Sequence, residues 1–495
     1  MIELILVGSF LLLVFLGIPI AFSMGLSAIF AILYASGTHA LNPAAGVMYA
    51  SLSSETLLAI PFFILAGVIM ELTGISTRLI ELADKVVGHR RSGLALTAII
   101  AALMFAAISG SGPATVAALG AVLIPALVKH GYTERHAASL LASAGGMGIV
   151  IPPSIAFIVF AVVASDHERV SISRLFMAGV IPGILMGLAF YLVARYLPRH
   201  TETLTANAGA KLSRGARRLG VTPRAAQTSG SPAGGAPSGS TASPQGETAT
   251  EGIITLEDTV DPDADVGRRT GRAPWGEIGV AFLKAVPGLL VPVIILGGIY
   301  GGIFTPTESA AVACVYALLV GLFFSRDLRL GGLFKVFTTA GVQSSRIMII
   351  VAAASLYAYV ITSNQIAARV SDTLLSLTES TLLLILLINV ILLLAGMFLD
   401  AVSAFYLLVP LLVPVLLELG MDITTIGVMM TINLALGLVT PPVGVNLLVA
   451  GSIAKIPYTE ATRGVWPFLG AGLVVLLLVT FIPQLSNWLP DLLGV

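Results

Sequence analysis

Charged residues are scarce in this chain. Asp, Glu, Lys and Arg together make up 11% of its 495 residues, against 57% hydrophobic residues. A soluble protein of this length needs more charge to cover its surface. Apolar stretches long enough to cross a bilayer instead recur along most of the chain. The composition therefore excludes an ordinary soluble globular protein and predicts a protein that crosses a membrane many times.

Cysteine is nearly absent as well, with Cys314 as the single example, so no disulfide framework can form. Because Cys314 lies within an apolar run, we expect a buried structural thiol. The sequence lacks the HExxH, GxxxxGK[ST], CxxC and GxSxG patterns of common metal, nucleotide and hydrolase sites. A formal net charge of zero gives no sign of a nucleic-acid partner. These absences speak against an enzyme and predict no organic cofactor.

One segment interrupts the apolar pattern. Residues 201–275 are rich in Gly, Ser, Thr, Ala and Pro, and their charge runs from basic through acidic to basic. Such a segment cannot bury enough apolar area to fold alone. We interpret it as a solvated linker, with a regulatory or partner-binding segment as the alternative. It divides a first unit, 1–200, from a second unit, 276–495.

The two units share three landmarks in the same order and at the same spacing. The matched pairs are Pro125 and Pro414, Gly131 and Gly420, and the dipeptides Pro152-Pro153 and Pro441-Pro442. Coincidence of all three indicates an internal duplication.

The distribution of Lys and Arg among the short loops predicts an orientation, because cytoplasmic loops are enriched in them. It puts the linker in the cytoplasm and both termini outside, with the segment near 4–18 as a first membrane helix rather than a removed signal peptide. The apolar pair near 93–108 and 114–128 then has both ends on the cytoplasmic side, which predicts a re-entrant hairpin. The second unit repeats this order upside down, with a hairpin near 380–418.

The expected fold is therefore an all-α polytopic membrane protein. It has two inverted-topology repeats, about ten transmembrane helices and two re-entrant hairpins, and this architecture is typical of secondary transporters.

Four breaks in helical sequence fall at membrane depth, two in each unit. They are 109–113, 151–154, 400–403 and 440–446. Such breaks survive only where protein buries them or where they line a watery cavity. They free carbonyl groups that suit a small hard cation and amide N–H groups that suit a carboxylate. We expect each hairpin tip to face the break of its own unit, with side-chain oxygens from Ser109, Ser111, Thr440, Asn446 and Asp400 completing the shells.

Asp400 differs from the other break residues because an ionisable group in a membrane segment is usually functional. It is interpreted as a cation ligand or a substrate-site residue, with capping of the hairpin tip as the alternative. Glu308, in the break TPTES, is expected to cap the helix that follows. Sodium is favoured over protons because the first-unit site contains no titratable side chain, although a proton route through Asp400 stays open.

Three sets of motifs together resemble the large membrane subunit of tripartite ATP-independent periplasmic (TRAP) transporters, the DctM-like family. They are GIFTPTESAAVACVYALL, the SGSG tip followed by IPPS, and LDAVS followed by TPPVGVN. The resemblance covers both units. It implies an elevator-type sodium symporter of the bacterial inner membrane that imports small organic anions, such as C4-dicarboxylates or sialic acids. It also implies two partners, a small four-helix membrane subunit on a separate chain and a periplasmic solute-binding protein.

The resemblance also assigns roles to residues of the breaks. The implied sodium-binding residues are Ser109, Gly110, Ser111, Gly145, Pro152, Asp400, Ser403, Thr440, Gly444 and Asn446. The implied substrate-binding residues are Ser111, Pro153, Ser154, Asp400 and Pro442.

Other readings of the sequence belong to different classes. A stand-alone sodium/anion symporter with similar hairpins would work without a binding protein. A membrane-embedded enzyme would need a catalytic dyad or a metal cluster, and a channel would not need paired breaks of inverted orientation. The break residues do not separate one class of organic acid from another.

Overall fold

The computed structural model describes residues 1–90, 92–197, 273–324 and 330–494. Every regular element in these ranges is helical, as the sequence predicts. Seven of the described helices are long and apolar enough to cross a membrane, or eight if one bent pair counts as a span. The all-helical class is thus confirmed, while the count of about ten spans stays a prediction. Nearly all of the 201–275 linker lies outside the described residues.

The elements before the linker end in a long helix. They are α1 (Ile2–Phe15), α2 (Ile20–Ser36), a 3-10 turn (Thr38–Leu41), α3 (Ala44–Leu52), α4 (Ala59–Leu72), α5 (Ile75–Val87), α6 (Gly93–Ser109), α7 (Gly112–Lys129), α8 (Glu134–Gly146), a second 3-10 turn (Met147–Ile149), α9 (Ile155–Ala164) and α10 (Ile172–Tyr196).

The elements after the linker follow a similar order. They are α12 (Trp275–Tyr300), α13 (Pro306–Leu319), a π-helical turn (Val320–Phe324), α14 (Leu330–Ser363), α15 (Ile366–Leu377), α16 (Thr381–Gly396), α17 (Ala401–Glu418), α18 (Ile423–Gly437), α19 (Val445–Ala454), α20 (Tyr458–Phe481) and α21 (Gln484–Leu493).

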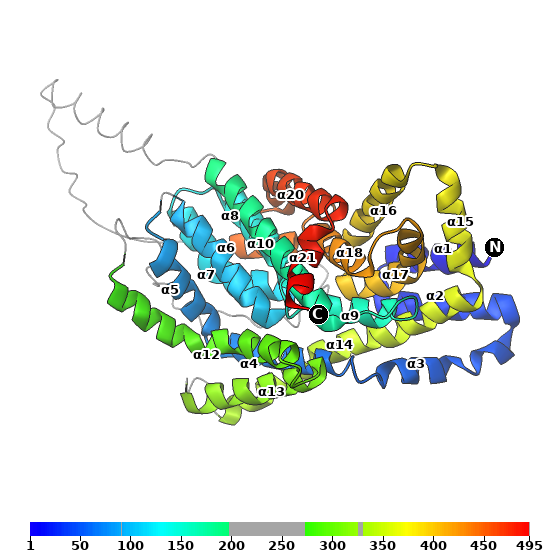
Figure 1. The fold of residues 1–495 in the computed structure, drawn as a ribbon, viewed down its shortest axis with the longest axis horizontal. Coiled ribbons are helices and arrows are strands. Elements are labelled where there is room, and N and C mark those ends of the chain that lie inside the picture. The colour runs from blue at the N-terminus through cyan, green and yellow to red at the C-terminus, as the bar shows by residue number, and fades with distance from the viewer. Residues whose placement is uncertain (91, 198–272, 325–329, 495) are drawn as a thin grey trace, which may run out of the picture.

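The helices form two groups. Helices α2, α3, α4, α12, α13 and α14 pack on one another along one long edge of the molecule, and we call them the outer row (Figure 1). Helices α6–α10 and α16–α21 lie on the other side, and we call them the hairpin bundle. With 34 residues, α14 is about 50 Å long at 1.5 Å per residue, well beyond the ~30 Å of a bilayer's hydrocarbon core.

Two amphipathic helices, which the sequence reading did not assign, connect the outer row to the hairpin bundle. Helix α5 leads from α4 to α6 and is bent by 68° from α4, while α15 leads from α14 to α16. Each begins after a residue of positive φ, Gly74 at 65° and Gln365 at 53°. A left-handed residue ends the preceding helix and lets the chain turn. The apolar residues of α5 recur at helical spacing, and Leu79 and Ile80 are fully buried.

The matched landmarks of the two units have the same local geometry. Gly131 and Gly420 have φ of 86° and 82°, and each follows a hairpin helix that the chain must leave. A backbone N–H one residue later donates back to the helix, from Tyr132 to the Leu127 carbonyl at 3.1 Å in the first unit. The equivalent bond in the second unit joins Met421 N to the Leu416 carbonyl at 3.0 Å. Both hairpins thus end in the left-handed glycine motif common at helix C-termini.

Two smaller predictions are confirmed. Thr305 and Glu308 form a reciprocal capping box at the start of α13, with the Thr305 N–H donating to Glu308 Oε2 at 2.8 Å. Cys314 is 4% exposed, and its thiol donates to the Phe62 carbonyl of α4 at 2.8 Å. The capping box thus fixes the start of α13, and Cys314 fixes its packing on α4 in the outer row.

Candidate functional site

The first hairpin turns at a tip of only two residues. Helix α6 ends at Ser109, Gly110 has a φ of 61°, and α7 begins at Gly112. A methyl group on Gly110 would lie 3.3 Å from the Pro153 carbonyl oxygen. The tip therefore packs directly on the first-unit break, as the sequence predicts.

Glycines let this tip approach the end of α8 closely. A methyl group on Gly148 would lie 2.8 Å from the Ser111 carbonyl oxygen and 2.9 Å from Thr115 Oγ1. The same carbonyl accepts the Thr115 hydroxyl at 2.8 Å, so it is held in place within the tip. A methyl group on Gly145 would lie 3.0 Å from the Gly112 carbonyl oxygen and 2.2 Å from a Val116 methyl. The backbone oxygens of the tip and of the break thus come together without side chains between them.

The first-unit break itself is buried. It runs through a 3-10 turn and the cis peptide bond between Pro152 and Pro153. Ser154 then caps α9, because its Oγ accepts the Phe157 N–H at 3.4 Å and donates to the Ile149 carbonyl at 2.5 Å. Pro152, Pro153 and Ser154 are all buried, whereas Ser109 and Ser111 are half-buried. In this structure Ser111 is thus more accessible to a solute than Pro153 or Ser154.

The tip of the second hairpin carries a carboxyl group, which accepts hydrogen bonds from the same hairpin. Asp400 is the N-cap of α17, with Oδ2 accepting the N–H groups of Val402 at 3.0 Å and Ser403 at 3.3 Å. Asp400 Oδ1 accepts the Ser403 hydroxyl at 2.5 Å. Of the two roles considered for Asp400, the structure contains the cap. A role as ion or substrate ligand stays a prediction, and it involves a half-buried carboxylate.

The second-unit break lies beside its own hairpin. The last residues of α16 and α18 cross so closely that a methyl group on Gly437 would lie 2.5 Å from the Gly396 carbonyl carbon. Beyond that crossing, the Thr440 hydroxyl donates back to the Leu436 carbonyl at 2.6 Å. Gly444, at a φ of 53°, sits over a group of carbonyls, with the Thr440 oxygen 3.1 Å from the position of a methyl group. Pro442 is exposed at the surface of this break.

Asn446 joins the two units, which the sequence did not predict. Its backbone N–H donates to the Leu438 carbonyl at 3.0 Å across the second break. Its side chain is 0% exposed and points into the first unit, where Nδ2 donates to the Ala142 carbonyl of α8 at 3.2 Å. A methyl group on Gly112 would lie 3.1 Å from both amide atoms of Asn446. The sequence reading put Asn446 in the second-unit site, whereas its side chain contacts the first.

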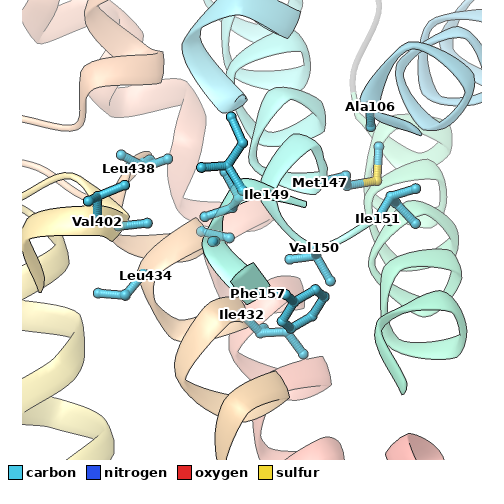
Figure 2. Packing of buried hydrophobic residues seen from close by; sticks show 14 of the residues in the cluster. Ala106, Met147, Ile149, Val150, Ile151, Phe157, Val402, Ile432, Leu434 and Leu438 are labelled. Atoms are coloured by element: carbon cyan, nitrogen blue, oxygen red, sulfur yellow. The ribbon is translucent and has the colours of Figure 1, made fainter. Parts of the chain in front are cut away.

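The second half of each broken span crosses to the other unit in the same way. Helix α19 packs on α7 and α8, and α9 packs on α17 and α18. Figure 2 shows apolar side chains of the first break, among them Ile149 and Val150, lying with Ile432 and Leu434 of α18 in one buried cluster. The first break is therefore packed into an apolar core that it shares with α18 of the second unit.

A cavity of about 400 Å³ lies elsewhere, between α5, α6 and α12. Its lining is apolar and includes Leu82, Met104, Trp275 and Phe282. None of the candidate ion or substrate residues lines it, so the candidate site is the region around the tips and breaks.

Comparison with known proteins points to one family. The family model described as "Tripartite ATP-independent periplasmic transporter, DctM component" matches residues 7–485. The chain is 36% identical over 472 residues to the C4-dicarboxylate TRAP transporter large permease protein DctM of Pseudomonas aeruginosa, covering 95% of this chain and 94% of that one.

A second relative is longer than this chain. The isethionate TRAP transporter permease protein DctMQ of Oleidesulfovibrio alaskensis is 35% identical over 481 residues, covering 97% of this chain but 65% of that protein. Among solved structures, the YdaH transporter of Alcanivorax borkumensis matches with a TM-score of 0.56 at 14% identity, covering 90% of each chain. At that identity the match speaks for the fold alone.

Proposed function

Because the chain belongs to the DctM family of TRAP transporter components, we propose that it is a large permease subunit that imports small organic anions with sodium. Membership makes it a transport protein rather than an enzyme, and the apolar helices fit a multi-pass protein of the bacterial inner membrane. The observation that carries the proposal is the meeting of the first hairpin tip, the end of α8 and Asn446 around paired glycines.

We propose that the chain consists of two inverted repeats and transports by an elevator-type movement, in which the hairpin bundle shifts against the outer row. The division into an outer row and a hairpin bundle supports it, since the candidate residues lie in the bundle. Helices α5 and α15 are the connections that would bend as the bundle shifts against the outer row. The matched glycine motifs at Gly131 and Gly420 support a duplicated origin for the two units.

Sodium is the proposed coupling ion because the oxygens at the first tip are neutral. The Asn446 amide oxygen and the Gly145 carbonyl oxygen lie 3.1 Å and 3.2 Å from the methyl position of Gly112, and the Gly112 carbonyl oxygen lies 3.0 Å from that of Gly145. The Ser111 carbonyl oxygen lies 2.8 Å from the methyl position of Gly148, also at this tip. Carbonyl, hydroxyl and amide oxygens suit a small hard cation, and broken membrane helices supply them in other sodium-coupled transporters. A coupling proton would need a titratable group at this tip.

The proposed solute is a small acid, bound between the two tips near Ser111, Asp400 and Pro442. Among the described residues, no side chain caps the N-terminus of α7. Uncapped N–H groups at helix N-termini favour an anionic group. The names of the two relatives, a C4-dicarboxylate and an isethionate transporter, support a carboxylate or sulfonate solute.

The proposed assembly contains a small membrane subunit of four helices on a separate chain and a periplasmic solute-binding protein. Family membership supports this assembly. The isethionate relative DctMQ supports it too, because this chain matches only 65% of that permease, which leaves room there for a further membrane component that would be a separate chain here. A stand-alone sodium/anion symporter is the alternative, and no observation favours it.

Reconstitution tests this assembly. Proteoliposomes containing this chain and the small subunit should take up the solute only when the loaded binding protein is added outside. Vesicles with this chain alone should take up no free solute. Uptake by this chain alone at a comparable rate would favour the stand-alone symporter.

A further inference from the structure

We propose that Asn446 supplies a ligand oxygen, from the second unit of the chain, to the cation site at the tip of the first hairpin. This inference deepens the proposed function and rests on it, since the cation is the coupling sodium ion. Both units would then contribute ligands to the first site. Sodium binding at the first tip would therefore depend on the conformation of the second break.

The first observation is an unsatisfied oxygen. Asn446 is fully buried, its Nδ2 donates to the Ala142 carbonyl at 3.2 Å, and its Oδ1 has no hydrogen-bond partner among the described residues. A buried amide oxygen without a partner has lost its hydrogen bonds to water and gained nothing in return. A bound cation would restore the missing interaction.

The second observation is the chemistry of the neighbours. A methyl group on Gly112 would lie 3.1 Å from Asn446 Oδ1 and 3.2 Å from the Gly145 carbonyl oxygen. One on Gly145 would lie 3.0 Å from the Gly112 carbonyl oxygen. The oxygens therefore gather where two glycines leave out their side chains. A cluster of acceptors suits a cation, because small hard cations bind several oxygen ligands at once.

The third observation links this oxygen to the second break. The backbone N–H of Asn446 donates to the Leu438 carbonyl at 3.0 Å, and α19 begins one residue earlier at Val445. The position of the side chain is thus fixed by the second break at one end and by the Ala142 carbonyl at the other. The amide both anchors itself through nitrogen and presents oxygen, which neither a hydrophobic residue nor a lysine could do.

Thermal unfolding of the purified protein measures sodium binding without transport. A ligand that binds the folded state raises Tm with its concentration. We expect sodium, but not choline, to raise the Tm of the wild-type protein. Asn446→Ala should raise the sodium concentration at half of this shift about tenfold. Asn446→Asp, which keeps an oxygen at this position, should stay within about threefold of the wild type.

Asn433→Ala is the matched control. Asn433 is also a fully buried asparagine of the second unit, and its Oδ1 likewise has no hydrogen-bond partner among the described residues. It lies within α18 rather than at a tip or break, and its Nδ2 donates to the carbonyl and the side-chain oxygen of Asn389, at 2.9 Å each. Its loss should lower Tm in the absence of sodium and leave the sodium midpoint unchanged. A purely structural role of Asn446 would give the same pattern.

A folded Asn446→Ala protein with the wild-type sodium midpoint overturns the inference. Should that variant not fold, Gly112→Ala tests the same contact, because its methyl group would press on the amide of Asn446 at 3.1 Å. We expect a midpoint several-fold higher for it, and a wild-type midpoint would again overturn the inference. A wild-type protein that responds equally to sodium and choline would overturn the sodium coupling itself, and with it this inference.

Discussion

The tips of the two hairpins differ in charge and in helix capping. The first tip is uncharged, and among the described residues no side chain caps the helix that leaves it, α7. The second tip carries Asp400, which caps α17 through two backbone N–H groups and accepts the Ser403 hydroxyl. The first tip thus has polar neighbours from other elements, including Asn446 of the second unit. At the second tip, by contrast, the polar groups bond to one another.

The difference shows that two units with the same Pro and Gly positions can have hairpin tips of different chemistry. The glycines of the first tip allow backbone oxygens to approach one another, so the site is made by packing. The carboxylate of the second tip stabilises the local turn whether or not an ion is bound. We therefore expect the first site to be sensitive to added side-chain volume and the second to be sensitive to the loss of its charge.

The largest effect is expected from Gly437→Ala. Its methyl group would lie 2.5 Å from the carbonyl carbon and 2.7 Å from the carbonyl oxygen of Gly396, and neither backbone atom can rotate away. Helices α16 and α18 would separate, at a cost of about 3 kcal/mol or more for an overpacked crossing. The amount of folded protein and its Tm should both fall sharply.

Gly148 sharpens this prediction, since it stands four residues before its Pro-Pro pair, as Gly437 does. Gly148→Ala should destabilise the protein less, because its methyl group meets a two-residue tip, at 2.8 Å from the Ser111 oxygen, and not a second helix. Gly470→Ala is the control, with nothing described within 4 Å of its methyl position. A Tm for Gly437→Ala equal to that of Gly470→Ala would contradict the close crossing.

The next largest effect separates the two roles of Asp400. Asp400→Ala removes both the cap and the charge, and losing a cap costs about 1 kcal/mol. Asp400→Ser keeps a good capping side chain but loses the charge. If Asp400 binds sodium, both variants should need about tenfold more sodium for half-maximal uptake.

Uptake against sodium concentration, in vesicles containing all three components, provides this measurement. Tm serves as the control for the cap, and we expect Asp400→Ser to keep nearly the wild-type value. A wild-type sodium curve for Asp400→Ser would mean that Asp400 is a cap alone.

The smallest effect is expected from Ser111→Ala. The carbonyl oxygen of Ser111 remains, held by the Thr115 hydroxyl at 2.8 Å, so only one hydroxyl is lost. The sodium concentration for half-maximal uptake should rise about twofold to fivefold, in line with one neutral polar contact. Ser165→Ala is the matched control, since the hydroxyl of the exposed Ser165 donates to the Val162 carbonyl of its own helix. Equal curves for the two variants would remove the Ser111 hydroxyl from the site.

Much of this arrangement could be predicted from local sequence. The capping box at the start of α13 depends on neighbouring residues, and Glu308 caps that helix as predicted. Gly131 and Gly420, which the sequence matches only as landmarks of the duplication, both lie in left-handed turns. The amphipathic helix α5 is not among the predicted membrane segments, because it is not a membrane-length apolar run. Its sequence, ISTRLIELADKVV, nevertheless carries apolar and charged residues at helical spacing, which is the signal of an amphipathic helix.

The position of Asn446 could not be predicted in this way. Its contacts with Ala142 and Gly112 join residues some 300 positions apart, and they exist only because α19 crosses to the first unit. No local pattern encodes such a crossing, since it follows from how the buried faces of α7, α8 and α19 fit together. The pairing of Gly112 with Gly145 was the one indirect sign, because glycines in membrane helices often mark close approach.

Solute uptake driven by a sodium gradient is the most direct test of the central claim. Proteoliposomes with this chain, the small subunit and the loaded binding protein would be given an inward sodium gradient, with equal pH on both sides. We predict that solute accumulates, and that an inward potassium gradient of the same size gives no accumulation. Accumulation driven equally well by a proton gradient in the absence of sodium would contradict the account.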